Sequence, residues 1–426
     1  MRQGMNPDLY REEWQWQEGD VTVTRSCQWS GPGCHQGCNV LFYTKDNKLV
    51  KIEGDPDGPL NKGGVCLKCL SQIQTVYSPR HVLHPMRRVG MRGTNEWMAI
   101  SWDEALDLVY DTMTALGDQY GKHTLQTFCG TGRDILWQSQ RLAYSMGTPH
   151  VESYSSGLAC WMPRLMSYNV STGGYMMPDC SECHEDRYDN PEYKDPEVIV
   201  VWGNNCVASN SDGFFGQWVV EVVKRGAKMI VVDPRLTWMA ARADLWIQPR
   251  PAVDSAVAMA MLNVIIYEGL VDYDFVGQWC SGFDELSEHV AQYTPEWAAP
   301  ITWLEPEQIR TAARMYATNT PGCIQWGCTW DQIGRASTTG SHAIALMRAL
   351  TGNLDVPGGD GMPGPALNFL TDEEMELNEL LPEEQRAKQI SRFKLTSWPG
   401  YSLISDTAKR TWGKTLPTEW FCEAHG

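Results

Sequence analysis

The chain has 426 residues, of which 42% are hydrophobic and 20% are charged, a balance typical of a globular protein with two or three domains. Its formal net charge of −17 argues against nucleic acid as a partner, because binding to a phosphate backbone depends on clustered Lys and Arg. We expect no membrane span, since no run of about 18 uninterrupted apolar residues is present. The N-terminal segment has no apolar core and no twin-arginine pair, so we expect a cytoplasmic protein unless a partner carries it out of the cell.

The first predicted element is a small antiparallel sheet. Segment 39–55 alternates apolar and polar residues on both sides of Asp46 and Asn47, a pair typical of a tight turn. The same region is rich in cysteine, with five of the 14 cysteines falling between Cys27 and Cys69. In a chain without an export signal, clustered cysteines indicate metal or redox chemistry before disulfides.

Four of these cysteines have the arrangement expected of iron–sulfur ligands. Cys27, Cys34 and Cys38 lie in one loop-like stretch, and Cys66 follows beyond the sheet. A 4Fe–4S cluster needs four convergent thiolates, usually three from one loop and one from elsewhere. A structural zinc site and buried free thiols are the alternatives, because spacing alone does not separate zinc from iron. Cys69 is a further thiolate that could replace one of the four.

The next elements point to an α/β protein. Ser101 and Glu104 form a predicted capping box for a helix that ends at Gly117 or Gly121. From about Pro196, short apolar runs alternate with helical patterns, which implies a parallel sheet covered on both faces. The runs are "EVIVVWGNN", "AKMIVVDPR" and "GCIQWGCTW", and the helices are 214–226, 254–270 (capped by Asp254), 305–318 and 338–353. The acidic segment 371–385 is predicted to be an exposed helix.

Two strand ends suggest a nucleotide site on physical grounds. A Gly-Asn turn at 203–204 brings backbone amides to where a pyrophosphate can bind. Asp233, which ends the next apolar run, can accept a hydrogen bond from a ribose or a base.

The sequence between Cys38 and Cys69 resembles the N-terminal segment of molybdopterin oxidoreductases of the dimethyl-sulfoxide-reductase family. The turn "EGDPDGPLNKG" before Cys66 and the basic Lys68 two residues after it carry this resemblance. By resemblance, Lys68 lies between the cluster and the pterin and assists electron transfer; an ordinary surface lysine is the alternative. "LTGNLDVPGGDG" at 350–361 also closely matches a loop characteristic of the family.

The resemblance implies further site residues along the chain. "FCGTGRD" looks like the glycine-rich loop beside the pterin, and the segment 147–165 looks like the one that presents a protein ligand, here Cys160, to molybdenum. A buried structural cysteine is the alternative reading of Cys160. The implied pterin-loop residues are Gly130, Gly132 and Arg133. The implied contacts to one guanine dinucleotide arm are Gly203, Asn204, Asn205, Ser209, Asp233, Arg235, Thr237 and Asp254, and those to the second arm are Gly327 and Thr329.

The implied fold class is α/β and multidomain: a small Cys-rich antiparallel β domain followed by α/β domains with mostly parallel sheets, one of them Rossmann-like. The expected domains are an iron–sulfur domain at 1–86, an α/β domain at the molybdenum and substrate funnel at 87–194 with 336–426, and a guanine-dinucleotide domain at 195–335. The family's C-terminal pterin-binding domain is expected to be absent, so we expect a fragment or a chain that pairs with a separate polypeptide.

The implied function is that of a catalytic subunit containing a 4Fe–4S cluster and molybdenum, or tungsten, bound by bis-molybdopterin guanine dinucleotide. It would transfer an oxygen atom or electrons between a small substrate and an iron–sulfur electron-transfer subunit. One alternative is an electron-transfer subunit of the same fold without molybdenum. Another is a non-redox hydratase or aromatic hydroxyl transferase. "CSECH", from Cys180 to His184, fits c-type haem attachment, but a plain loop or a redox role near the active site remains open.

Overall fold

The computed structural model describes residues 14–28, 37–58, 61, 63–129, 136–148, 151–153, 162–173, 176–178, 194–207, 213–327, 329–330, 336–362, 380 and 382–384. These residues divide into two compact units. The first comprises the described parts of Met1–Leu70 and Leu158–Leu367, and the second comprises those of Ser71–Gly157 and Asn368–Tyr401. Within the described part, no helix is both long and apolar enough to cross a bilayer. The expected domain boundaries stay a prediction.

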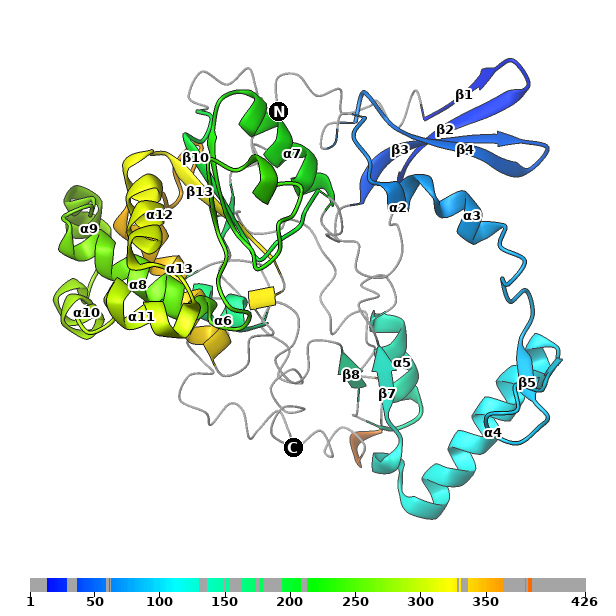
Figure 1. Ribbon diagram of the computed structural model, residues 1–426. Coiled ribbons are helices and arrows are strands. Elements are labelled where there is room, and N and C mark those ends of the chain that lie inside the picture. The colour runs from blue at the N-terminus through cyan, green and yellow to red at the C-terminus, as the bar shows by residue number, and fades with distance from the viewer. Residues whose placement is uncertain are drawn as a thin grey trace. The chain divides into compact units, whose positions relative to one another are not determined.

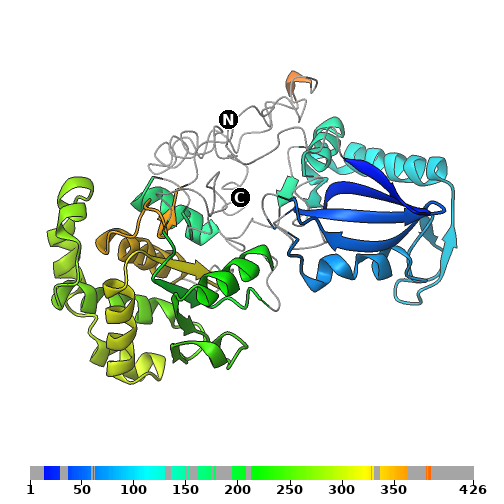
Figure 2. The ribbon, with the colours of Figure 1, turned by 90° about the horizontal axis from the view of Figure 1, so that it is seen from above.

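The N-terminal strands form the antiparallel sheet that the sequence predicts (Figure 2). Its order is β1 (Gln15–Glu18), β2 (Val21–Gln28), β3 (Cys38–Lys45) and β4 (Lys48–Gly54). Asp46 and Asn47 join β3 to β4 with positive φ angles of 49° and 58°, the backbone that a tight two-residue hairpin requires. Two short helices follow, α2 (Leu67–Leu70) and α3 (Gln72–Val76).

The predicted parallel sheet is also present. Its strands run in the order β12 (Leu245–Ile247), β11 (Lys228–Val232), β10 (Val198–Trp202) and β13 (Gly322–Trp326). Trp202 pairs in register with Val232 on one side and with Trp326 on the other. The carboxyl ends of these three strands are therefore level, and the loops that follow them begin along one edge.

Alternate residues of the strands pack against helices on opposite faces, as continuous apolar strand sequences require. Val198, Val200 and Trp202 of β10 belong to one hydrophobic cluster, and Ile199 and Val201 belong to the other. Helix α7 (Gly213–Lys224) lies on one side of the strands (Figure 1). On the other side lie α8 (Asp254–Tyr267), α11 (Pro295–Thr302), α12 (Pro306–Thr318) and α13 (Ser337–Leu350).

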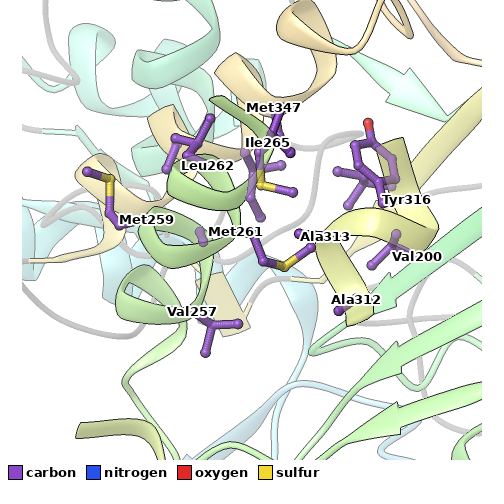
Figure 3. Packing of buried hydrophobic residues seen from close by; sticks show 14 of the residues in the cluster. Val200, Val257, Met259, Met261, Leu262, Ile265, Ala312, Ala313, Tyr316 and Met347 are labelled. Atoms are coloured by element: carbon purple, nitrogen blue, oxygen red, sulfur yellow. The ribbon is translucent and has the colours of Figure 1, made fainter. Parts of the chain in front are cut away.

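Side chains of α8, α12 and α13 gather in the larger cluster around Val200 (Figure 3). The elements of this part of the chain are α6 (Met162–Ser171), β9 (Met177–Pro178), η3 (Ala240–Arg242), α8 (Asp254–Tyr267), α9 (Tyr273–Trp279), α10 (Phe283–Val290), α11 (Pro295–Thr302), α12 (Pro306–Thr318), α13 (Ser337–Leu350) and β14 (Asp360–Gly361).

The second unit contains the long helix that the sequence predicts after Ser101. The Ser101 hydroxyl accepts a hydrogen bond from the Glu104 backbone N–H at 3.1 Å, and Gly121, at φ 96°, follows its last residue. The elements are β5 (Met86–Arg88), β6 (Trp97–Ala99), α4 (Trp102–Tyr120), η1 (Lys122–Thr124), β7 (Thr127–Cys129), α5 (Leu136–Ser145) and β8 (Val151–Ser153). The helix thus begins and ends where its capping residues place it.

Two local expectations are wrong. Asp254 is the first helical residue of α8 rather than its N-cap, which is Val253, because the Asp254 carboxylate is held from outside the helix by an indole N–H of β10. The run 322–330 is strand only as far as Trp326, because Gly327 turns back against β10. Of the acidic segment 371–385, only residues 380 and 382–384 are described.

Candidate cofactor sites

The first candidate site is at the end of the antiparallel sheet where β2 meets β3. Cys27 and Cys38 lie in β2 and β3 rather than in the predicted loop. Cys27 pairs with Asn39 and Gln28 pairs with Cys38 across the two strands, so the two cysteines are one position apart but on opposite faces of the sheet. The Asn39 side-chain N–H donates to Cys27 Sγ at 3.5 Å. Such donors stabilise a thiolate and lower its electron-donating power toward a metal.

The loop that leads to Cys66 is tied to the same strands. Asn61 accepts a hydrogen bond from the Asn39 backbone N–H at 2.9 Å and donates to the Asn39 carbonyl at 3.0 Å. Asp55, fully buried, forms an ion pair with Arg25 of β2 at 3.0 Å. These contacts explain the composition of the turn "EGDPDGPLNKG": its Asp and Asn side chains fasten the loop to the sheet.

The structure distinguishes Cys66 from Cys69. Cys69 is 2% exposed, and its thiol donates to Gln28 Oε1 at 3.2 Å, while the Gln28 amide donates to the Cys69 carbonyl at 3.3 Å. Cys66 is partly exposed, and Cys27 is exposed. The Cys69 thiol is thus held by Gln28 of β2, whereas Cys66 is the more accessible of the two thiols; Cys38 is buried like Cys69.

The described thiols fit an iron–sulfur cluster by the chemistry of their donors, since thiolates are its usual ligands. Cys34 lies outside the described residues. Among the side chains that are described, no group of three or more His, Cys, Asp or Glu is already arranged to hold a metal. Lys68 lies on α2, half-buried, between Cys66 and Cys69 in the chain.

The second candidate site is the carboxyl edge of the parallel sheet. Gly203 follows β10 with φ +56°, and its N–H donates to the Val232 carbonyl at 2.8 Å. The Thr329 hydroxyl donates to the Gly203 carbonyl at 3.0 Å. A Cβ atom on Gly327 would lie 2.7 Å from the same carbonyl oxygen, so this position has no room for a side chain. The fold therefore brings together residues predicted for both dinucleotide arms.

The residues after β11 form a compact turn at the same edge. Asp233 is 6% exposed, and its carboxylate accepts from the Arg235 backbone N–H at 2.8 Å. Thr237 caps the following turn by accepting from the Ala240 N–H at 3.1 Å. The Arg235 side chain is 71% exposed. Asp233 is thus fixed by the turn, and the exposed Arg235 guanidinium lies 4.0 Å from its carboxylate.

Asp254 is the second acidic group there, and it is only 8% exposed. It accepts a hydrogen bond from the Trp202 indole N–H at 2.9 Å. Burial raises the pKa of the Asp254 carboxyl, the Trp202 hydrogen bond opposes that rise, and the negative charge of Asp233 adds to it. A carboxylate in this setting gains from a ligand that brings hydrogen-bond donors.

These groups fit a dinucleotide. Asn204 is 5% exposed, and Asn205 Oδ1 is a buried acceptor without a hydrogen-bond partner among the described residues. A bare glycine backbone, a buried amide acceptor and two carboxylates suit a phosphate-bearing group with a polar base.

Several predicted residues and motifs lie outside the described residues. They are Cys34, Gly130, Gly132, Arg133, Cys160, Ser209 and the "CSECH" motif from Cys180 to His184.

Sequence reasoning missed the aromatic chain beneath this edge. The ring centroids of Trp202 and Trp330 lie 5.1 Å apart, those of Trp330 and Trp326 5.8 Å, and those of Trp326 and Tyr168 5.1 Å. Trp202 and Trp326 are the last residues of their strands, directly before Gly203 and Gly327. Their position before predicted ligand-binding turns is the only signal in the sequence.

It also missed a buried ion pair that secures β13. Arg348 Nε lies 2.8 Å from Asp360 Oδ2, and both side chains are fully buried. Asp360 accepts from the Ile324 N–H at 3.2 Å, and Arg348 donates to the Ile324 carbonyl at 2.8 Å. The pair thus hydrogen bonds with backbone groups on the outer edge of β13. On the same edge, Asn353 Oδ1 accepts a hydrogen bond from the Gly322 N–H at 2.7 Å. Asn353 and Asp360 both belong to the loop "LTGNLDVPGGDG".

Comparisons with known proteins match two parts of the chain. The molybdopterin oxidoreductase family matches residues 82–405, and the molybdopterin oxidoreductase Fe4S4 domain matches residues 32–78. Acetylene hydratase of Syntrophotalea acetylenica is 30% identical over 390 residues, which cover 89% of this chain and 50% of that protein. Dimethyl sulfoxide reductase DmsA of Escherichia coli (strain K12) is 29% identical over 77% of this chain and 43% of its own length.

The fold is similar to a solved structure as well. Acetylene hydratase from Pelobacter acetylenicus superposes with a TM-score of 0.70 at 25% identity, over 93% of this chain and 52% of that one. The chain spans about half the length of the curated relatives it matches. Its cofactors are those of the matched domains, a 4Fe–4S cluster and molybdenum with molybdopterin. With a family match over residues 82–405 and a cluster-domain match before it, the chain belongs to the molybdopterin oxidoreductases, a family of enzymes that includes the dimethyl sulfoxide reductases.

Proposed function

We propose that this chain is the cofactor-holding portion of a catalytic subunit that uses molybdenum or tungsten in its bis-molybdopterin guanine dinucleotide form. The reaction is transfer of an oxygen atom or electrons between a small substrate and a redox partner, with the 4Fe–4S cluster on the electron route. When bound, the metal supplies the redox chemistry; the protein binds, orients and shields the cofactor.

The observation that carries the proposal is the order of the parallel strands. Strand β10 comes first in the sequence, with β11 on one side and β13 on the other. In such sheets the ligand binds at the carboxyl edge where the strand order reverses direction. Gly203 and Gly327 meet at that point, which supports a Rossmann-like assignment for this part.

The residue roles follow from what each group offers. Gly203 and Gly327 let a pyrophosphate approach the backbone, and Thr329 secures their turn. Asp233 and Asp254 accept hydrogen bonds from ribose and guanine, while Arg235 offers a cation to a phosphate. Further contacts to the same guanine dinucleotide arm come from Asn204, Asn205, Ser209 and Thr237. Cys27, Cys34, Cys38 and Cys66 ligate the cluster, Lys68 stands beside it, Cys160 ligates the metal, and Gly130, Gly132 and Arg133 flank the pterin.

The proposed partner is an iron–sulfur electron-transfer subunit. It is supported by the kind of enzyme found among the relatives, such as DmsA.

A second candidate function is hydration without net redox change. It is favoured by one specific observation, the similarity to acetylene hydratase in both sequence and fold. A dye-linked electron assay separates the two candidates, since a hydratase turns over substrate without reducing or oxidising the dye.

Metal analysis of anaerobically purified protein tests the proposal. We expect about four irons with acid-labile sulfide per chain, as the cluster requires, together with molybdenum or tungsten and with GMP released on acid hydrolysis. Iron without either metal would favour the electron-transfer subunit instead. One zinc without sulfide would refute the cluster, and no GMP would refute the dinucleotide form.

A further inference from the structure

Trp202 makes an unusual contact for a strand residue in a hydrophobic core. It is the last residue of β10 and is fully buried, yet its indole N–H points to a carboxylate, donating to Asp254 Oδ1 at 2.9 Å. A donor to an ionised acceptor makes a stronger hydrogen bond than a neutral pair. The contact joins β10 to the first residue of α8, across the turn where Gly203 begins.

The indole is itself fixed. Trp330, 1% exposed, packs edge-on against it with centroids 5.1 Å apart and an interplanar angle of 66°. A Cβ atom on Gly340 of α13 would lie 2.7 Å from the Trp330 ring, so that ring is closely enclosed too. The donor direction of Trp202 is therefore set by packing before any ligand arrives.

The environment of Asp254 shows why the Trp202 indole N–H affects the charge of this carboxyl. Burial and the charge of Asp233 both raise the pKa of its carboxyl, and the Trp202 hydrogen bond lowers it. Within the described part of the chain, Asp233 is the charged group that acts on Asp254. The N-terminus of α8 also favours the ionised form. Only the ionised carboxylate accepts on both oxygens, and guanine presents two adjacent donors, N1–H and its 2-amino group.

We propose that Trp202 is the positioning residue of the guanine site, its indole N–H holding the Asp254 carboxylate ionised and oriented towards the donor edge of guanine. This inference rests on the proposed dinucleotide function of the sheet edge. Trp202 acts through Asp254 and does not touch the ligand. An adenine base, whose corresponding edge lacks these two donors, gains nothing from the arrangement.

The test uses the full chain prepared without cofactor, with GDP and ADP as probes in calorimetric titrations across pH. Wild type is expected to prefer GDP, with affinity falling as Asp254 is protonated at lower pH. Trp202→Phe keeps an aromatic side chain but removes the donor together with part of the ring area, so GDP affinity should drop about tenfold, the usual effect of losing a hydrogen bond to a charged group. Because the lost bond lowers the pKa of Asp254, the fall should begin at higher pH in the variant. ADP binding should not change.

Trp218→Phe is the matched control. Trp218 is 1% exposed, and its indole N–H has no hydrogen-bond partner among the described residues, so the variant reports the loss of ring area alone. In an Asp254→Asn background, Trp202→Phe should cost much less than in wild type, as a double-mutant cycle requires for a direct coupling.

The outcomes separate the two levels of the argument. The positioning role is wrong if the preference for GDP depends on Asp254 but not on Trp202 and the pH profile is the same in Trp202→Phe as in wild type. That result would still agree with a dinucleotide site. Failure of wild type to prefer GDP overturns both. If Trp202→Phe does not fold, the ¹⁵N-indole resonance of Trp202 in wild type decides: it should titrate with Asp254 and stop titrating in Asp254→Asn. A pH-independent resonance refutes the proposal.

Discussion

At the residue scale, the buried Asp254 carboxylate lowers the stability of the fold when it is ionised. Its pKa is raised by burial, so the folded protein binds that proton more tightly than the unfolded chain. The ionised group therefore destabilises the fold, and its unfavourable contribution grows as pH rises from the unfolded carboxyl pKa through the folded one.

Asp254→Asn should stabilise the cofactor-free chain at neutral pH by about 0.5–2 kcal/mol, the range usual where a functional group is removed. The amide still accepts from Trp202, and the pH dependence due to this group disappears. Urea unfolding at several pH values measures both effects. Asp20→Asn, which removes a surface partner of Lys45, should change stability little; an equal gain there would contradict this account.

Two neighbouring thiols are expected to respond differently to substitution. Cys66→Ser should abolish the iron–sulfur absorbance and the bound iron, because the cluster loses a ligand. Cys69→Ser should retain the iron, since the Cys69 thiol is hydrogen bonded to Gln28 and a hydroxyl can replace it. Iron and sulfide assays on both variants measure this. The opposite pattern would exchange the roles of the two residues.

At the scale of single elements, side chains supply hydrogen-bond partners for backbone groups on the side of β13 that pairs with no strand of the parallel sheet. Arg348, Asp360 and Asn353 hydrogen bond with its outer backbone groups at Gly322 and Ile324. The Arg348 guanidinium also lies 4.7 Å from the centroid of the Trp326 ring, directly before Gly327. The loop 350–361, which resembles a loop characteristic of the family, thus supplies side chains that hold β13 at the edge of the parallel sheet.

Arg348→Met should destabilise the first unit by about 3–5 kcal/mol, because it leaves the buried Asp360 without its ion-pair partner. Asp360→Leu in addition should restore part of the loss, since an apolar pair avoids the desolvation penalty. Ser101→Ala serves as the comparison in the second unit and should cost only about 1 kcal/mol, as usual for an N-cap. Chemical unfolding followed by tryptophan fluorescence measures these losses; equal losses from Arg348→Met and Ser101→Ala would contradict this role of the ion pair.

At the scale of the whole molecule, two candidate cofactor sites of different chemistry lie on two separate sheets. The antiparallel sheet carries thiol donors, and the parallel sheet offers backbone and carboxylate groups. The proposed electron route needs a group between the metal and the cluster, and Lys68 is the predicted one.

Lys68→Ala should slow substrate-dependent electron transfer by about 10–100-fold, the range seen for outer-shell residues of metal sites, while iron and molybdenum contents stay at wild-type values. Rapid-mixing reduction of the cluster by substrate in the complete enzyme measures it. Lys48→Ala, on β4 of the same sheet, is the control. Unchanged kinetics in Lys68→Ala would make Lys68 an ordinary lysine of α2.

Much of the fold could be predicted from local sequence signals. The Asp46–Asn47 turn, the Ser101 cap and the alternation of buried strands and helices each depend on a few neighbouring residues, because backbone geometry and burial periodicity are local properties. The predicted cofactors follow from the same kind of signal, short motifs with glycine and cysteine at fixed spacing. The family matches confirm the 4Fe–4S cluster and molybdenum with molybdopterin, and the guanine dinucleotide form stays a prediction.

The tertiary structure alone decided which residues far apart in the chain contact each other. Trp202 meets Asp254 across 52 positions of the chain, and Asp360 of the loop 350–361 meets Arg348 of α13 at the edge of β13. The sequence by itself determined which elements form and which chemistry the chain carries. It could not determine whether Asp254 caps a helix or accepts from an indole, or that Cys69 is buried against Gln28 while Cys66 is partly exposed, because burial and partners exist only after the chain has folded.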